Sequence, residues 1–571
     1  MASEDPSAYV AVRRADVRAL ISLTDVAIVG GGPGGLMLAI ELGFRGIDCV
    51  MFEQNTRPPQ LPKANATSAR TMEHYRRRGF AHEVRAIGMP PDYPQDIVYT
   101  TRLAEHELTR FHIPSAGQAA AQESFGDLQV ERWPTPELPH RGQQMFVEPI
   151  LKAQAEGYPS VSMRFGERVT AVRDDGDTVH LEAQDIESGA MTAIDARYAI
   201  GCDGPRSLVR QVMGTVYGGT RGAKRDFMGG NMLSLYFRSA TLYDILNKPK
   251  AWQYWAVNPE QRCVMCAIDG IDTFVLLVQL KEDRTAGAVD PDEVIRKAVG
   301  ATFPYELIAE VPWHAGYALV AEKFKTGRLL IAGDAAHLFT PTGGMGYNTS
   351  IDDVVNLGWK LAAVLQGWAP ESLLDTYETE RRPIALRNTT FAGRMADSIG
   401  GMPLSPLLEQ TGEEAAAARE KLGEALAAHV RREFNIPGLQ LGVRYESPIV
   451  ATEDGPPPPD EPNEYVPSGY PGARSPHRPI GMGSLLDRFG SEFTLLLFAE
   501  TSSEPWERAA ARLRIPLTVV RSEDPRAHTL YGGDFVLVRP DGHIAWRGDA
   551  SAEPTTILAL ATGATMTTAH A

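Results

Sequence analysis

A run of glycines near the start of the chain constrains the fold more than any other feature. Gly30, Gly32 and Gly35 have the spacing Gly-x-Gly-x-x-Gly, directly after the apolar segment 26–29. The first glycine permits a tight turn out of a strand, the second leaves room for a pyrophosphate, and the third allows a helix to pack closely on the strand. The pattern therefore predicts a βαβ unit at the start of a doubly wound α/β sheet.

The second strand of this unit supplies a carboxylate where a dinucleotide needs one. We predict a helix over 36–44 and a strand over 49–52, which ends at Glu53. A carboxylate there accepts hydrogen bonds from the hydroxyls of an adenosine ribose. A glycine-rich turn without a ligand is the alternative, but the free N–H groups of the following helix favour phosphate binding. This motif alone does not distinguish FAD from NAD(P).

Two later segments point to FAD. Residues 200–210 are typical of a strand end and a sharp turn that contains Asp203 and Gly204, followed by a helix. Another strand, over 328–333, precedes Asp334, and the carboxyl end of a strand is where such sheets bind their ligands. Residues 341–346 are rich in glycine, and the helix predicted after them would stabilise negative charge on a reduced isoalloxazine ring.

These three segments, in this order, resemble the signature motifs of the class A FAD-dependent aromatic hydroxylases, the flavoprotein monooxygenases related to phenol and p-hydroxybenzoate hydroxylase. The resemblance covers residues 24–400. Segments 470–477 and 537–547 resemble the larger branch of the family, which carries a C-terminal thioredoxin-like domain. The resemblance implies a monooxygenase that hydroxylates a phenolic aromatic compound with FAD, NAD(P)H and O2, through a flavin C4a-hydroperoxide.

The resemblance also implies which residues bind the cofactor, and they come from all three motifs and the segments between them. The implied set is Gly30, Gly32, Gly34 and Gly35 for the pyrophosphate, Glu53 for the ribose, Arg70 for the phosphates, Gln144 for the flavin, Asp203 and Gly204 for FAD and NAD(P)H, Asp334 for the ribityl chain, and Pro341, Gly344, Met345 and Gly346 for the flavin ring.

The expected substrate site departs from the family pattern. Phenol-type relatives often have an Asp or His five residues before the position of Arg70, where this chain has Asn65. Asn cannot accept a proton at neutral pH, so another group or water is the base, or the substrate arrives ionised, as a nitro- or carbonyl-activated phenol would. We expect Asn65 and Tyr254 to be catalytic, and both to contact the substrate together with Trp252 and Trp255. Packing in a sheet core is the alternative for the aromatic residues.

The length of 571 residues predicts several domains. We expect a Rossmann-like FAD-binding domain over 1–205, with part of the substrate layer at 100–145. An antiparallel substrate-binding sheet follows over 206–318. Residues 319–440 complete the FAD-binding domain and add helices, and residues 441–571 form the thioredoxin-like domain.

Charge and cysteine content limit the partners. Lys and Arg number 56 against 72 Asp and Glu, a net charge of −16 that repels phosphate backbones and anionic lipid headgroups. We therefore expect no nucleic acid and no membrane partner, but a cytoplasmic homodimer that meets a small aromatic substrate and O2. We expect no metal site, because Cys263 and Cys266 alternate in a strand pattern and would face opposite sides.

Alternatives remain at this point. One is a flavin oxidase or halogenase, although the Trp-x-Trp-x-x-Ile-Pro motif associated with halogenases is absent from the sequence. Another is a non-catalytic flavoprotein that serves as a partner in a complex. Substrate-dependent consumption of NAD(P)H distinguishes them, because only the hydroxylase couples it to insertion of oxygen.

Overall fold

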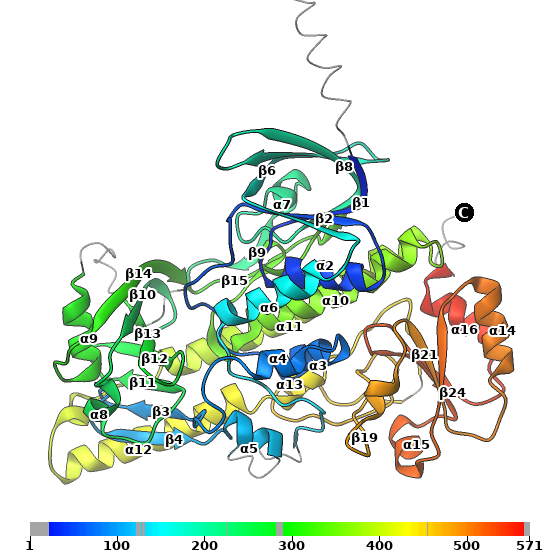
Figure 1. The fold of residues 1–571 in the computed structure, drawn as a ribbon. Helices are drawn as coiled ribbons and strands as arrows, with labels where there is room; N and C mark the ends of the chain where they lie inside the picture. Colours follow the sequence, from blue (N-terminus) through cyan, green and yellow to red (C-terminus); the bar gives the residue numbers. More distant parts are fainter. Residues whose placement is uncertain are drawn as a thin grey trace, which may run out of the picture.

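The computed structural model describes residues 22–121, 127, 132–223, 225, 227–280, 289–453 and 455–564. The first 21 residues of the FAD-binding domain predicted over 1–205 lie outside these residues. Figure 1 shows two strand-rich parts at opposite ends of the molecule, with the long helices α10 (Met345–Leu365) and α11 (Asp375–Gly400) between them.

The first sheet carries the predicted βαβ unit. Strand β1 pairs in parallel with β2 and β8, and helix α2 (Pro33–Phe44) packs against α10. The sheet is completed late in the chain, where Leu329 in β17 pairs with Ala199 in β8. The path β16-β17-β8-β1-β2-β5 is extended by β6 and β7, and its strands are β1 (Ser22–Val29), β2 (Cys49–Glu53), β5 (Val161–Phe165), β6 (Glu167–Asp174), β7 (Val179–Asp185), β8 (Met191–Gly201), β16 (Lys325–Thr326) and β17 (Leu329–Ile331).

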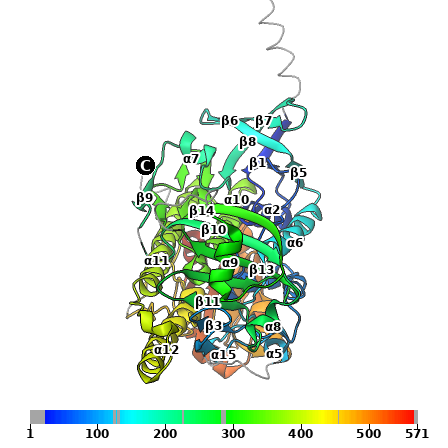
Figure 2. The ribbon, with the colours of Figure 1, turned by 90° about the vertical axis from the view of Figure 1, so that its left-hand side faces the viewer.

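The second sheet has the order β14-β10-β13-β12-β11-β3-β4. Side-chain alternation divides it into two apolar faces. One face contains Trp255 and Cys266 and packs with α12 (Glu413–Phe434), whereas the other contains Cys263 and packs with α8 (Leu242–Leu246) and α9 (Pro291–Val299), as Figure 2 shows. The two cysteines therefore lie on opposite faces, as predicted. The strands are β3 (Ile97–Thr100), β4 (Glu107–Phe111), β10 (Gly230–Arg238), β11 (Gln253–Val257), β12 (Arg262–Ala267), β13 (Thr273–Gln279) and β14 (Glu306–Ala315).

The C-terminal part has its own mixed sheet, in the order β22-β21-β23-β24. Its core continues into α10, because Trp359 of that helix packs edge-on against Phe493 of β21. The elements are β21 (Phe493–Leu497), β22 (Leu517–Arg521), β23 (Phe535–Val538), β24 (Ile544–Gly548), α14 (Glu504–Leu513), α15 (Pro525–Tyr531) and α16 (Pro554–Ala561). The predicted α/β class is confirmed, while the exact domain boundaries stay a prediction.

Shorter elements connect these parts. A small sheet has the order β18-β15-β9, and β19 pairs with β20. Their bounds are β9 (Tyr217–Thr220), β15 (Ala318–Ala321), β18 (His337–Leu338), β19 (Pro479–Ile480) and β20 (Gly483–Ser484), and the remaining α-helices are α3 (Ala69–Arg77), α4 (Ala81–Arg85), α5 (Ala116–Ala121), α6 (Gln144–Glu156), α7 (Leu208–Val212) and α13 (Pro437–Leu441). Among the described residues, no helix is both long enough and apolar enough to cross a membrane.

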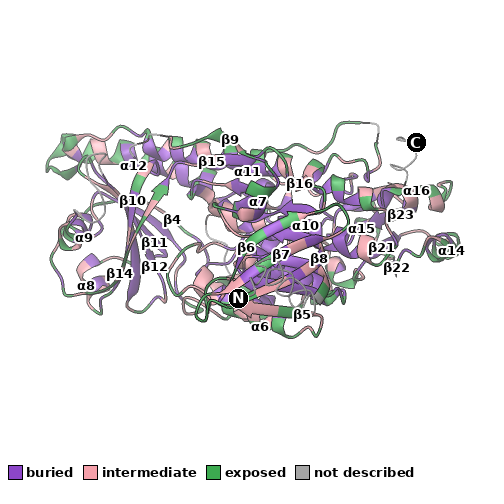
Figure 3. Cartoon of the chain, turned by 90° about the horizontal axis from the view of Figure 1, so that it is seen from above, coloured by how far each residue is buried: buried purple, intermediate pink, exposed green. Residues whose placement is uncertain are grey.

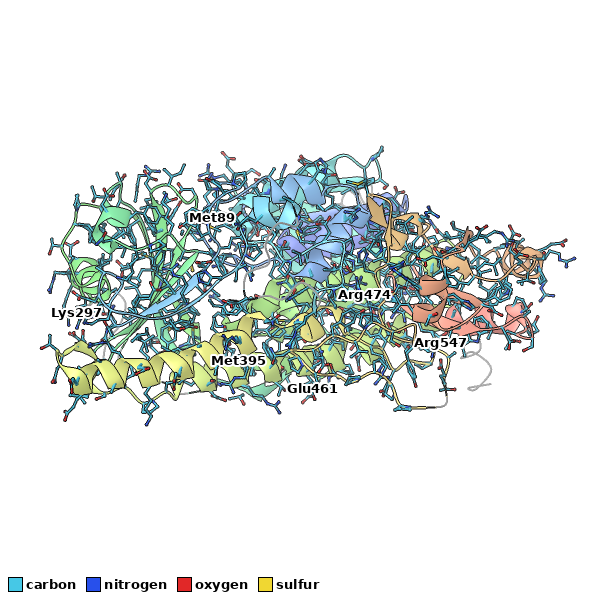
Figure 4. The ribbon with its side chains drawn as sticks, turned by 90° about the horizontal axis from the view of Figure 1, so that it is seen from below. Met89, Lys297, Met395, Glu461, Arg474 and Arg547 are labelled. Atoms are coloured by element: carbon cyan, nitrogen blue, oxygen red, sulfur yellow. The ribbon has the colours of Figure 1, made fainter. Side chains whose placement is uncertain are left out.

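Buried ion pairs join the C-terminal part to the helices. Arg539 donates to Glu380 at 2.7 Å and to Asp541 at 2.6 Å, and Lys360 also reaches Glu380 at 2.7 Å. All four side chains are buried. Figure 3 shows that α10, which carries Lys360, is largely purple, the colour of buried residues. A second pair links Arg474 to Glu73 of α3, and Figure 4 shows Arg474 between the helices and the C-terminal strands. The C-terminal part is thus fixed to the rest by charges that water does not screen.

These pairs predict acid sensitivity. Burial alone would raise the pKa of Glu73 and Glu380, but the charges of Arg474 and Arg539 outweigh it and lower both pKa values from 4.5 to about 2. A carboxyl whose pKa is lowered by folding stabilises the protein above its unfolded pKa, and this stabilisation is lost as the pH falls towards the folded pKa. We expect the melting temperature to drop steeply below about pH 4.5. A melting temperature that stays level from neutral pH to about pH 3 would contradict this.

Candidate active site

A cavity of about 870 Å³ opens at the carboxyl ends of the strands in the first sheet. This is the place where a doubly wound sheet binds a dinucleotide. The volume lies within the range that ligand sites occupy, which is roughly 300–1,000 Å³. The predicted cofactor-binding residues that line the cavity are Gly30, Gly32, Gly34, Glu53, Gln144, Asp203, Gly204, Asp334 and Gly346.

The glycine turn lets neighbouring backbone atoms lie very close to it. A Cβ atom on Gly30, whose φ is +107°, would lie 2.3 Å from the carbonyl oxygen of Cys202. A Cβ on Gly35 would lie 1.9 Å from the carbonyl oxygen of Gly30, although Gly35 does not line the cavity. A Cβ on Gly32 would meet nothing within 4 Å. The protein's own packing therefore requires the first and third glycines, while the second leaves open space into which a pyrophosphate fits.

Glu53 is held at the end of β2 facing this turn. Its Oε2 accepts a hydrogen bond from the backbone N–H of Gly31 at 2.8 Å, and its Oε1 accepts from the N–H of Asn55 at 2.8 Å. Both bonds fix the carboxylate where its remaining lone pairs can accept ribose hydroxyls. The geometry is compatible with the role that the resemblance implied.

Asp203 and Asp334 face the cavity from the ends of β8 and β17. Asp203 Oδ2 accepts from the N–H of Leu208 at 2.7 Å, whereas its Oδ1 is buried without a hydrogen-bond partner in the described part of the chain. Burial raises the pKa of Asp203, and desolvation by the cavity walls raises that of Asp334. Both carboxyl groups would gain from the hydroxyl donors of a polyol, so the residues present fit FAD.

The structure places Arg70 away from the cavity, and its predicted contact with the FAD phosphates stays a prediction. Its Nη2 donates to the carbonyl oxygen of Asp541 at 2.6 Å and its Nη1 to Glu73 at 3.1 Å, so its guanidinium lies at the junction with the C-terminal part and does not line the cavity. Lys63, only seven residues earlier, does line it. The signal available in the sequence was a second cation, Lys63, seven residues before Arg70, because an ammonium group binds phosphate well.

The loop before α10 is shaped by two consecutive glycines with positive φ, Gly343 at +72° and Gly344 at +62°. Asn348 holds this loop by donating from Nδ2 to the carbonyl oxygen of Gly344 at 2.7 Å. Of the predicted flavin-ring residues, Gly346 lines the cavity, whereas Pro341, Gly344 and Met345 do not. Met345 packs its side chain in a small apolar cluster, so only its backbone is free to approach a flavin.

Glu433 of α12 was not predicted, yet it supports this loop. Its carboxylate is 2% exposed, and Oε1 accepts a hydrogen bond from the N–H of Gly343 at 2.9 Å. Oε2 lies 2.9 Å from Nε2 of His429, one turn earlier in the helix. No motif in the sequence marks this residue, because the contact joins segments 90 residues apart.

Removing this support is expected to weaken FAD binding. Glu433→Ala leaves the Gly343 N–H without its acceptor, and a hydrogen bond to a charged group contributes about 1.5–3 kcal/mol. We expect the dissociation constant for FAD, measured by quenching of flavin fluorescence, to rise about tenfold or more. Glu433→Gln retains an acceptor oxygen and is the matched control. Equal FAD affinity in the Ala and Gln variants would contradict a role in holding the loop.

Three predicted substrate residues meet at one face of the second sheet. Asn65 donates from Nδ2 to Sγ of Cys266 at 3.4 Å. On the same face, Trp255 stacks on Tyr99 with ring centroids 5.4 Å apart. Trp252, at the start of β11, belongs to the same apolar cluster. Aromatic surface therefore borders Asn65.

Tyr254 lies on the other face of the sheet. It is fully buried, and its hydroxyl accepts a hydrogen bond from the N–H of Ala251 at 2.7 Å. Burial raises its pKa to about 12. Neighbouring residues in a strand point to opposite faces, so a residue next to Trp255 cannot share its face. The structure thus does not bring Tyr254 together with Asn65, and its catalytic role stays a prediction.

Comparison with known proteins agrees with this geometry. The FAD binding domain family matches residues 23–392, and the C-terminal family of aromatic-ring hydroxylases matches residues 468–568. The chain belongs to the FAD-dependent aromatic-ring hydroxylases. The family resemblance inferred from the motifs, FAD as the cofactor and the monooxygenase class are thereby confirmed.

Relatives of this hydroxylase match over nearly its whole length. The FAD-dependent monooxygenase apdD of Emericella nidulans is 31% identical, over 92% of this chain and 87% of the relative. A 4-methyl-5-nitrocatechol 5-monooxygenase of a Burkholderia species is 30% identical, over 92% and 94%. The structure of RebC with bound 7-carboxy-K252c superposes with a TM-score of 0.86 at 33% identity, over 95% of this chain and 100% of RebC.

The residues that line the cavity can be matched to the parts of FAD that they would bind in this hydroxylase. The glycine turn and Lys63 would hold the pyrophosphate, Glu53 the ribose and Asp334 the ribityl chain. The N-terminus of α10 would stabilise negative charge near the ring. Bound there, FAD supplies electron transfer from NAD(P)H and activation of O2. If the substrate binds beside Asn65, as predicted, the buried aromatic face there would exclude water from its ring.

Proposed function

We propose that this hydroxylase acts on an aromatic ring whose phenolic hydroxyl is already acidified by a nitro or carbonyl substituent. The observation that carries the proposal is the environment of Asn65. Its amide donates to the thiol of Cys266, beside Trp252 and Trp255, and an amide cannot take a proton from a phenol. Phenols react with electrophilic oxygen as phenolates, so a substrate that ionises by itself needs no base at this position.

Similarity to a nitrocatechol monooxygenase supports the same substrate class, because a nitro group acidifies the phenol of that relative's named substrate. The aromatic face also suits a planar substrate, since Trp and Tyr rings offer stacking surface. NAD(P)H as reductant and O2 as oxygen donor follow from the family. The homodimer expected from the sequence stays a prediction, which light scattering of the purified protein tests.

The test is NAD(P)H oxidation by the FAD-loaded protein with a panel of phenols that differ in acidity, with products identified by mass. We expect nitro- and carbonyl-substituted phenols to stimulate oxidation and to gain one oxygen atom, and phenol itself to do neither. Preference for unactivated phenols would overturn the proposed substrate class. Hydrogen peroxide without oxygen insertion would indicate an oxidase, a requirement for halide a halogenase, and flavin binding without any NAD(P)H oxidation a non-catalytic flavoprotein.

A further inference from the structure

A buried cation, Arg141, lies beside the aromatic face. Arg141 is 6% exposed, and its guanidinium carbon lies 4.5 Å from the centroid of the Trp252 ring. Its Nε is buried without a hydrogen-bond partner in the part of the chain that the structure describes. Burial lowers the pKa of Arg141 to about 10, and at neutral pH it remains charged.

Three other buried arginines differ from Arg141, and Arg210, which also forms no ion pair among the described residues, donates hydrogen bonds to carbonyl oxygens instead. Arg381, Arg474 and Arg539 each form an ion pair with a buried carboxylate. Among the described residues, Arg141 forms no such pair. An unpaired buried charge is costly in a protein interior, and the cation–π contact with Trp252 offsets only part of that cost. The protein therefore keeps a destabilising charge at this position.

Backbone pairing places Arg141 beside the predicted substrate residues. Thr67 and His140 exchange two hydrogen bonds of 2.9 Å, and the N–H of Gln144 donates to the carbonyl oxygen of Ala64 at 2.7 Å. The segment that contains Arg141 thus runs antiparallel to the segment that contains Asn65. Gln144, three residues after Arg141, lines the cofactor cavity. Trp252, which Arg141 contacts, belongs to the aromatic face. Arg141 therefore lies between the cofactor cavity and the aromatic face.

We propose that Arg141 binds an oxyanion carried by the aromatic substrate, a phenolate or a ring carboxylate. This assignment rests on the proposed function and deepens it. A phenol that arrives ionised needs a positive charge near its oxygen more than it needs a base. Arg141 supplies that charge, whereas the amide of Asn65 is neutral. A guanidinium binds a planar oxyanion with two parallel N–H donors, which also fixes the orientation of the ring.

The first test measures anion preference in FAD-loaded protein with two probes of matched shape, 4-nitrophenolate and the neutral 4-nitroanisole. We expect the wild type to bind the anion at least about tenfold more tightly than the neutral probe. Arg141→Met, which keeps the length but not the charge, should abolish that preference. Arg141→Lys should retain part of it, because the charge remains but the fork of donors is lost.

The second test separates ligand binding from packing by thermal unfolding without substrate. Removal of an unpaired buried charge should leave the melting temperature of Arg141→Met unchanged or higher. Arg474→Met is the matched control and should lower it, because Glu73 then loses its partner. A preference for the anion that survives in Arg141→Met, or a drop in melting temperature as large as that of the control, would make Arg141 a packing residue.

The same measurements keep the two proposals apart. If phenols drive NAD(P)H oxidation but the wild type shows no preference for the anionic probe, only the assignment of Arg141 fails. If acidified phenols neither bind nor stimulate oxidation, the proposed substrate class fails, and the assignment of Arg141 fails with it.

Discussion

Gly35→Ala is expected to prevent stable folding of the first sheet, whereas Gly32→Ala should fold normally and fail to bind FAD. The added Cβ at Gly35 would lie 1.9 Å from the backbone oxygen of Gly30, and neither backbone can yield without opening the packing of α2 on β1. We expect a loss of several kcal/mol in the free energy of unfolding. At Gly32 the added Cβ meets no protein atom within 4 Å and projects where the pyrophosphate must approach.

Circular dichroism melts of the FAD-free proteins, followed by FAD titration, give both quantities. Gly32→Ala should melt within about 2 °C of the wild type, since a surface change away from contacts is nearly neutral. Its affinity for FAD should fall about a hundredfold or more, which corresponds to about 2.7 kcal/mol. Normal FAD binding by Gly32→Ala would show that the pyrophosphate does not cross this turn, and normal melting of Gly35→Ala would contradict the packing argument.

Arg539→Met is expected to cause the largest loss of stability at the junction with the C-terminal part. It leaves the carboxylates of Glu380 and Asp541 buried with Lys360 as the remaining cation near them. Removing one partner of a buried ion pair costs about 3–5 kcal/mol. We expect the midpoint of urea unfolding to fall and hydrogen exchange in β23 to accelerate, because Arg539 directly follows that strand.

A surface pair in the same part of the chain provides the control. Arg508 and Glu504 lie 3.7 Å apart on α14, and both side chains are largely exposed. Exposed pairs contribute about 0–1 kcal/mol, so Arg508→Met should change the midpoint little. Equal effects of the two substitutions would show that the buried network does not hold the C-terminal part in place.

Local patterns singled out several residues that the structure brings together around one cavity. The glycine turn, Glu53 at the end of β2 and Asp334 at the end of β17 all follow from strand ends meeting at one edge of a sheet. That physical rule needs only the order of elements along the chain. The alternation of side chains along a strand correctly predicted that Cys263 and Cys266 point to opposite faces of the sheet. The same rule applies to Tyr254 and Trp255, which are neighbours in β11 and therefore cannot share a face.

Contacts between distant segments could not be predicted in the same way. Arg70 turns away from the cavity because Asp541, 471 residues later, offers it a carbonyl oxygen. Glu433 and Arg141 carry no motif. Their significance comes from burial beside Gly343 and Trp252, and burial of a charged side chain depends on tertiary packing that a single sequence does not specify.

The late entry of β17 into the first sheet also has a consequence for how the protein matures. A nascent chain that has been synthesised only to Gly204 carries Glu53 and Asp203 but lacks Asp334 and the start of α10. Domains of most proteins fold from the N-terminus onwards as they leave the ribosome. Here more than a hundred further residues must be synthesised after β8 before Leu329 can pair with its edge. We therefore expect the chain to bind FAD only after translation has passed the helix that follows Asp334.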